Sequence, residues 1–233
     1  MAVVMLVDDE SGPAPAVIEA AIELSRSFGA EICCIDRQAG PCAAPQATAI
    51  RGHRQSPHEP SAGLCEICLK RDAEERDDLL ASATFIVSSS TARLIRMIER
   101  GYGPVLMLPP SQLHFSAAGR VMVVASDSPQ FGRALMLCQP LLDRAAHVDV
   151  MGKAGDNNLL DTCAELLTGH GITAARREFA GAALSFEEAL RVVCRRESIA
   201  WSLLIPNHRG GSTLDLEARQ LLYDPPCPLL VAQ

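Results

Sequence analysis

A short apolar run led by a proline occurs twice in this chain, and it constrains the fold more than any other feature. Residues 101–110 read GYGPVLMLPP, and residues 224–232 read DPPCPLLVA. Each run is too short for a helix and is typical of a buried strand. Pro104 and Pro228 fit the first position of that strand, where a missing N–H is tolerated. Each run also follows a stretch that reads as a helix, at 91–100 and 214–222.

The two halves of the chain also begin alike. Residues 2–9 and 120–127 are apolar runs that end on an acidic residue. Each is followed by a small or proline-bearing loop, an amphipathic helix and a second strand, at 31–35 and 147–151. A repeat of about half the chain indicates duplicated units rather than a solenoid. We therefore predict two units, at 1–110 and 119–233.

The remaining segments continue the alternation of strands and helices. A capping-box pattern, SFEE, opens a helix at 185–188. Strands alternating with helices predict parallel sheets with right-handed crossovers and helices on both faces. Residues 37–63 carry four prolines and no periodicity, so we expect a long or partly disordered loop within the first unit. The other expected elements are strands at 64–69, 84–87, 172–179 and 201–205, and helices at 70–81 and 158–168.

Composition and charge argue against several classes of protein: nucleic-acid-binding, membrane and secreted proteins. The net charge of −7 argues against a nucleic-acid surface, which needs clustered Lys and Arg. No apolar run approaches the roughly 18 residues of a membrane span, and no basic segment precedes the first strand, so we expect neither a membrane protein nor a signal peptide. Nine cysteines without a secretion signal favour reduced thiols in a cytoplasm. Cys138, Cys163 and Cys194 fall in helical patterns and read as small core residues.

This order of elements resembles a tandem member of the universal stress protein family. The resemblance rests on three features of each half: the Val-rich strand ending in Asp, the apolar strand before a polar turn, and the last helix running into Pro-Val-Leu or Pro-Leu-Leu. It covers both halves but not residues 37–63. It implies two α/β units like those of adenine nucleotide alpha hydrolases, packed as a pseudo-dimer with strands 105–108 and 229–231 paired. It leaves a further homodimer open.

The same resemblance implies a stress-response binding or regulatory protein. In that family an aspartate after the first strand meets the adenine, and a glycine motif after the fourth strand holds ribose and phosphates. Asp8 fits the aspartate position in the first half, but the glycine segment there reads SSSTA at 88–92. In the second half Asp127, or less well Ser126, takes the strand-end position. No catalytic triad or pair of acids is evident in the sequence, so we expect no enzyme activity.

The second half keeps part of the glycine motif. Asn207 and Gly210 have the spacing of its first two glycines, and Gly211 and Ser212 follow at once, without the intervening segment of the family. Glycines let a backbone approach an anion closely, and a helix start favours negative charge. The resemblance therefore implies degenerate, weak binding of ATP, with the second half favoured. The alternative is that Asp8 and Asp127 cap their loops and that residues 207–213 form a plain turn and N-cap.

A separate cluster suggests a second function. His53, His58, Cys65 and Cys68 supply the ligand types and the number that a tetrahedral zinc site needs. The alternative is that the two cysteines lie in a strand, where their spacing would put them on opposite faces. The competing hypothesis is thus a metal- or redox-responsive module at 53–68. Zinc analysis of the purified protein separates the two, because only the module predicts about one equivalent of metal.

Overall fold

The computed structural model describes residues 2–7, 14–36, 83–88, 91–109, 115–179, 185–206 and 216–232. The predicted strand at 64–69, helix at 70–81 and loop at 37–63 lie outside these residues. The strands are β1 Ala2–Val7, β2 Glu31–Asp36, β3 Phe85–Ser88, β4 Val105–Met107, β5 Arg120–Val124, β6 His147–Lys153, β7 Ala174–Phe179, β8 Ile199–Leu204 and β9 Leu229–Val231. The helices are α1 Pro15–Phe28, α4 Thr91–Glu99, α5 Phe131–Leu142, α6 Asn157–Gly169, α7 Phe186–Glu197 and α8 Leu216–Tyr223.

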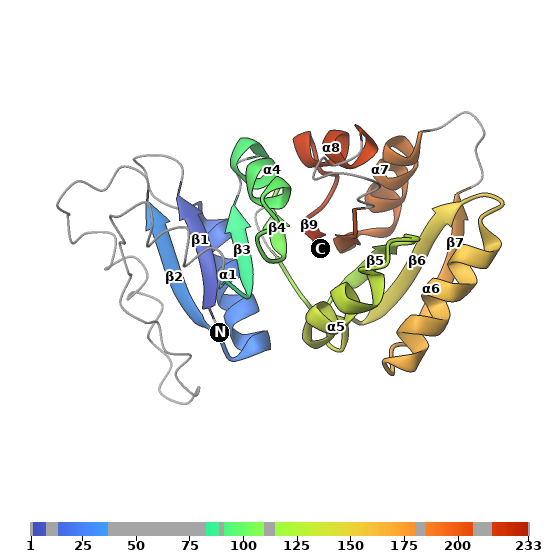
Figure 1. Cartoon of the computed structure of the whole chain (residues 1–233), viewed down its shortest axis with the longest axis horizontal. Helices are drawn as coiled ribbons and strands as arrows, with labels where there is room; N and C mark the ends of the chain where they lie inside the picture. Colours follow the sequence, from blue (N-terminus) through green and yellow to red (C-terminus); the bar gives the residue numbers. More distant parts are fainter. Residues whose placement is uncertain are drawn as a thin grey trace.

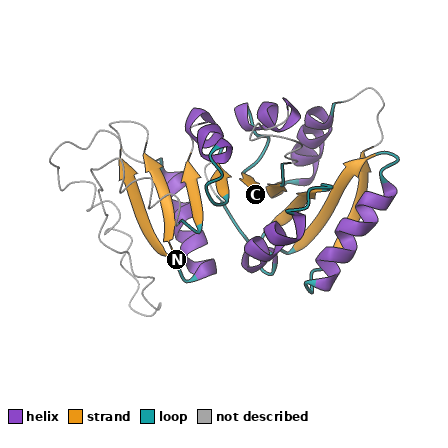
Figure 2. Ribbon diagram, viewed as in Figure 1, coloured by secondary structure: helices purple, strands orange, loops and turns teal. Residues whose placement is uncertain are grey.

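The described strands form one mostly parallel sheet that runs through the molecule (Figure 2). Its order is β2-β1-β3-β4-β9-β8-β5-β6-β7. Every neighbouring pair is parallel except β4 and β9, which are antiparallel. We call β1 to β4 with their helices the first half, and β5 to β9 with theirs the second half. The predicted fold class, a parallel α/β sheet, is confirmed.

Helices cover both faces of the sheet, as the alternation of elements predicts (Figure 1). The buried side chains of α1, α5 and α6 share one apolar core, and those of α4, α7 and α8 share a second core on the opposite face. Both cores are mainly aliphatic, and Trp201 is the largest fully buried side chain. No helix in the described ranges is long and apolar enough to cross a membrane.

The two prolines stand directly before β4 and β9, one residue earlier than the predicted first position of each strand. Neither needs an N–H there, and both carbonyls still join the sheet: Pro104 accepts from Ile86 N at 2.9 Å, and Pro228 accepts from Ser202 N at 2.8 Å. Each short strand closes in the same way. Leu108 N donates to the carbonyl of Ser88 at 3.2 Å. Ala232 N donates to the carbonyl of Leu204 at 3.1 Å.

The glycines before β4 have specific local roles. Gly101 has φ +71° and ends α4, with Tyr102 N bonded to Met97 O at 3.1 Å, the longer bond of a Schellman motif. A side chain at Gly103 would place its Cβ 2.7 Å from the Ala83 carbonyl oxygen, so the chain passes that carbonyl only with glycine. The turn that leads into the proline is therefore fixed by two glycines.

The pairing of β4 with β9 is confirmed, and it joins equivalent positions. Leu106 and Leu230 each stand two residues after the leading proline, and they face each other at the centre of the pair. Both side chains are fully buried. Helices at equivalent places in the two halves also meet across the boundary: α1 contacts α5, and α4 contacts α8. The complete register is Val105 with Val231, Leu106 with Leu230, and Met107 with Leu229.

Local signals in the second half are confirmed with small shifts. Ser185 and Glu188 form the predicted capping box: Glu188 N donates to Ser185 Oγ at 3.2 Å, and Ser185 N donates to Glu188 Oε2 at 2.8 Å. The helix predicted to stop at Gly169 includes that glycine, and the left-handed residue after it is Gly171, with φ +80°. The three cysteines predicted to lie in helix cores are buried and free: Cys138, Cys163 and Cys194.

We predict that Leu106→Ala destabilises the whole protein by about 2–5 kcal/mol, because it leaves a cavity where the two halves meet. The matched control is Leu166→Ala on the outer face of α6, where the side chain is 40% exposed, with an expected cost of about 0.5 kcal/mol. Urea unfolding of both variants measures the difference. A Leu106→Ala variant as stable as the control would show that this contact contributes little.

Candidate functional site

The carboxyl end of β5 lies where the connections of the chain switch from one face of the sheet to the other. Strand β5 sits between β8 and β6 and runs parallel to both. The chain leaves β5 through α5 on one face of the sheet and leaves β8 through α8 on the other. Such a topological switch point is where open parallel sheets place their ligands. The loop after β5 and the segment after β8 therefore flank the expected binding crevice.

The loop after β5 is shaped by hydroxyl groups. Ser128 N donates to Ser126 Oγ at 3.2 Å, and Gln130 N donates to Ser128 Oγ at 3.3 Å. Ser128 is buried, whereas Asp127 between the two serines is exposed. The first turn of α5 follows at Phe131, and the structure shows no side-chain hydrogen bond from its N-cap residue, Gln130. Asp127 thus holds a carboxylate at the edge of the sheet, beside a helix start.

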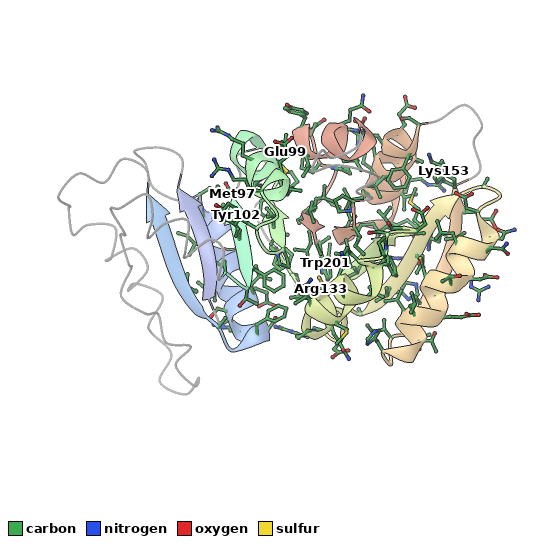
Figure 3. All side chains as sticks on the ribbon, in the orientation of Figure 1. Met97, Glu99, Tyr102, Arg133, Lys153 and Trp201 are labelled. Carbon is green, nitrogen blue, oxygen red and sulfur yellow. The ribbon has the colours of Figure 1, made fainter. Side chains whose placement is uncertain are left out.

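A positive charge also lies at this edge. Lys153 is the last residue of β6, and its exposed side chain stands at the end of that strand (Figure 3). In the sheet register Val124 is opposite Met151, so Lys153 reaches the level of Ser126 in the neighbouring loop. Sequence reasoning missed Lys153, because the strand was expected to end at Met151. A basic residue at the end of an apolar strand is the signal that could have found it.

Of the predicted nucleotide-binding residues, the structure places Asp127 alone, and it places Asp127 at the switch point. The other five lie outside the described residues: Asp8, Asn207, Gly210, Gly211 and Ser212. Strand β8 ends at Leu204, and Ile205 and Pro206 are buried directly before that segment. The sequence predictions for residues 207–212 therefore stay predictions.

The proposed metal ligands also lie outside the described residues: His53, His58, Cys65 and Cys68. Within the parts of the chain that are described, no group of three or more His, Cys, Asp or Glu side chains could hold a metal ion. The zinc hypothesis at 53–68 therefore stays a prediction.

The opposite end of the second half carries a cluster of charged side chains that the sequence analysis missed. Asp149 on β6 is completely buried. Its Oδ2 accepts from Arg120 Nε at 2.6 Å, and its Oδ1 lies 2.8 Å from Arg177 Nε and 3.1 Å from His147 Nε2. Glu197 at the end of α7 forms ion pairs with the same two arginines, and its Oε2 lies 2.8 Å from Arg120 Nη1. Two carboxylates and two guanidinium groups thus alternate around a ring.

The ring shifts the pKa of Asp149 and of Arg177. Burial alone raises the pKa of Asp149, but the contacts and positive charges of Arg120 and Arg177 outweigh it and hold that pKa below its usual value. The same contact with Asp149 is the main reason that the pKa of Arg177 is raised. The pair of Arg177 Nε and Asp149 Oδ1, 2.8 Å apart, is an ion pair. Asp149 is therefore charged throughout the neutral range.

The position of the ring indicates a structural role. Arg120 begins β5, whereas Asp127 follows the other end of that strand, so the ring lies at the end of the sheet away from the switch point. Glu197 is the last residue of α7, and its bonds hold the end of this helix against β5 and β7. An aspartate inside the apolar run of β6 was the available signal, because a charge at a buried strand position requires partners.

Comparison with solved structures finds similar folds among universal stress proteins. A universal stress protein from Archaeoglobus fulgidus DSM 4304 matches with a TM-score of 0.63 and 13% identity, over 99% of this chain and 96% of that chain. A putative universal stress protein from Pseudomonas aeruginosa UCBPP-PA14 matches with a TM-score of 0.55 and 10% identity, over 99% of this chain and 92% of that chain. No protein-family model and no curated protein matches the sequence. At this identity the likeness shows the fold.

We predict that Asp149→Asn destabilises the protein at pH 7 by about 3–5 kcal/mol, because it leaves two arginines around an uncharged side chain. Since the folded-state pKa of Asp149 is lowered, its contribution is fully present above the unfolded pKa of about 3.9. That contribution is lost as the pH falls toward the folded-state pKa, so the gap between wild type and Asp149→Asn should narrow in acid. Urea unfolding from pH 7 to pH 3 measures this gap.

The matched control is Asp161→Asn. Asp161 on α6 pairs with Arg176, the neighbour of Arg177, but on the other face of β7, and its side chain is 46% exposed. An exposed pair of this kind contributes about 0–1 kcal/mol. If the two variants behave alike at pH 7, the buried ring does not have the role assigned to it.

Proposed function

We propose that this protein is a non-enzymatic binding or regulatory protein of the universal stress type that acts in a stress response. The observation that carries the proposal is the antiparallel pairing of β4 with β9 at the centre of an otherwise parallel sheet. The match to the Archaeoglobus fulgidus universal stress protein over 99% of this chain supports it. So does the order of elements that the sequence shares with that family.

The proposal includes a pseudo-dimer made within one chain. Three pairs of elements make the main contacts between the halves: β4 with β9, α1 with α5, and α4 with α8. In each pair an element meets its own counterpart, which is the property of an isologous, twofold interface. The order of four strands agrees, since β2-β1-β3-β4 on one side of the boundary corresponds to β6-β5-β8-β9 on the other, and β7 lies beyond β6. In a chain built in this way, the contact that pairs two subunits in the family lies between the two halves. Any homodimer would therefore use another surface.

The contact between α1 and α5 includes specific polar groups. Arg144, two residues after the end of α5, forms an ion pair with Glu23 of α1 at 2.8 Å. Its other terminal nitrogen donates to Ser27 Oγ of α1 at 2.5 Å. These bonds orient two helices that have the same place in the two halves. The apolar centre and this polar rim together resemble a protein–protein interface.

We further propose that the second half binds an adenine nucleotide weakly, at the switch point between β5 and β8. Asp127 would meet the adenine end, as the family resemblance implies. The predicted donors for the ribose and phosphates are Asn207, Gly210, Gly211 and Ser212. Lys153 adds a positive charge at the same edge. The first half has Asp8 but no glycine after β3, so its backbone can approach a phosphate less closely.

We predict that calorimetric titration with ATP gives weak binding to the wild-type protein, with an affinity at least tenfold lower in Asp127→Ala and in Gly210→Val. Each charge-assisted hydrogen bond that is lost costs about 1.5–3 kcal/mol, and a valine side chain at residue 210 blocks the approach of a phosphate. Asp8→Ala should bind ATP as the wild type does.

Asp143→Ala is the matched control for Asp127→Ala. It removes the same charge from an exposed position at the far end of α5, and it should leave ATP binding unchanged. Tight binding to the wild type, or loss of binding in Asp8→Ala alone, would overturn the assignment to the second half.

A further inference from the structure

Two buried cysteines of the second half lie beside each other. Cys194 Sγ and Cys227 Sγ are 3.5 Å apart, and Ser202 Oγ lies 3.1 Å from Cys227 Sγ. Both thiols are free, with exposed fractions of 6% and 4%. The distance is short enough that a small rotation could bring the sulfurs to bonding distance, about 2.05 Å in a disulfide. The three side chains therefore form a compact cluster of two thiols and a hydroxyl.

The backbone fixes this arrangement. Cys194 lies in the last turn of α7, and Cys227 lies two residues before β9, in the second proline-led run. Ser202 on β8 is opposite Leu229 in the sheet, and its N–H donates to the Pro228 carbonyl at 2.8 Å. The residue before Pro228 is thereby held against Ser202. The cluster is thus built from three different elements, each positioned by regular hydrogen bonding.

Cys138 and Cys163, the other two cysteines whose side chains the structure describes, lack such a neighbour. Cys138 is buried on α5 among apolar side chains, and this burial raises the pKa of its thiol to about 12. Cys163 on α6 contacts the carbonyl oxygen of Ser126 at 3.7 Å, and burial is the main cause of its raised pKa. Both behave as inert core residues. They provide internal references for the reactivity of the pair.

The two thiols of the pair differ in acidity. The contact with the neighbouring Cys227 sulfur lowers the pKa of Cys194, against the effect of burial, and Ser202 adds to this lowering. The same contact, together with burial, raises the pKa of Cys227. The thiolate is the reactive form of cysteine, and a lowered pKa favours the thiolate of Cys194.

We propose that Cys194 and Cys227 form a redox-active dithiol that a hydroperoxide oxidises reversibly to a disulfide. The Cys194 thiolate attacks one oxygen of hydrogen peroxide, the O–O bond breaks, and the second oxygen leaves as hydroxide, which takes a proton to become water. Cys194 is then a sulfenic acid. Cys227 attacks its sulfur, the S–O bond breaks, and a second water leaves with the Cys227 proton. Two thiols are oxidised by two electrons, and one peroxide is reduced to two waters.

The disulfide would tie the end of α7 to the start of β9. It would close a loop of 33 residues that contains β8 and α8, and so restrain the unfolded chain. Cys194 is three residues before Glu197, so the disulfide would also restrain the last turn of α7, which carries Glu197 into the charged ring. This inference does not rest on nucleotide binding.

Peptide mapping of the full-length wild-type protein tests the proposal directly. The reduced protein is treated with a modest excess of hydrogen peroxide, remaining thiols are alkylated, and trypsin releases residues 192–195 and 220–233. We expect these two peptides to be joined by a disulfide that a reducing dithiol removes. The pair should react at least roughly tenfold faster than Cys138, because the thiolate fraction sets the rate. The melting temperature should rise by roughly 5–15 °C on oxidation.

Single variants test the order of attack. In Cys227→Ser, peroxide should add one oxygen atom to Cys194, whereas in Cys194→Ser the remaining Cys227 should stay reduced. Cys138→Ser is the matched control and should form the disulfide as the wild type does. If the wild-type pair stays reduced while Cys138 is modified, or if Cys194 pairs with a different cysteine, the proposal is wrong. That result does not depend on whether the variants fold.

Discussion

The pairing of β4 with β9 is the contact on which the rest of the structure depends. Each strand is only three residues long, and each contributes side chains that are almost completely buried. Without its partner, each half would end in an open, apolar edge strand, which is a site for aggregation. The paired strands instead form the centre of the sheet, and both helical layers continue across them. The apolar side chains buried at this boundary join the two halves into one folded unit.

The same pairing explains where chemistry can occur. Because β4 and β9 pair with each other at the centre of the sheet, the carboxyl ends of the inner strands are where a ligand can reach the second half. The two ends of β5 differ. Arg120 at its start belongs to a ring of charges that fixes α7, whereas Asp127 beyond its end stands exposed at the switch point. One end is stabilised by ion pairs, and the other presents polar groups to solvent.

Local sequence signals predicted much of the fold. The prolines at 104 and 228 placed both central strands, and the capping box at Ser185 placed the start of α7, because each signal acts within a few residues. The charged ring and the thiol pair could not be predicted in this way. Arg120, Asp149 and Arg177 meet only after three strands have taken their register, and Cys194 meets Cys227 only after α7 packs beside β9. Of the predicted nucleotide-binding residues, the structure describes Asp127 alone, and it lies in the loop three residues after β5 rather than, as predicted, as the last residue of the strand.

Native-state hydrogen exchange of the full-length protein tests the central claim, that the β4–β9 pair makes the two halves a single cooperative unit. The account predicts that the amides of 105–107 and 229–231 exchange only by global unfolding, with the same free energy as the inner strands of both halves. Exchange of β4 and β9 at a clearly lower free energy would contradict it. So would one half that opens while the other remains protected.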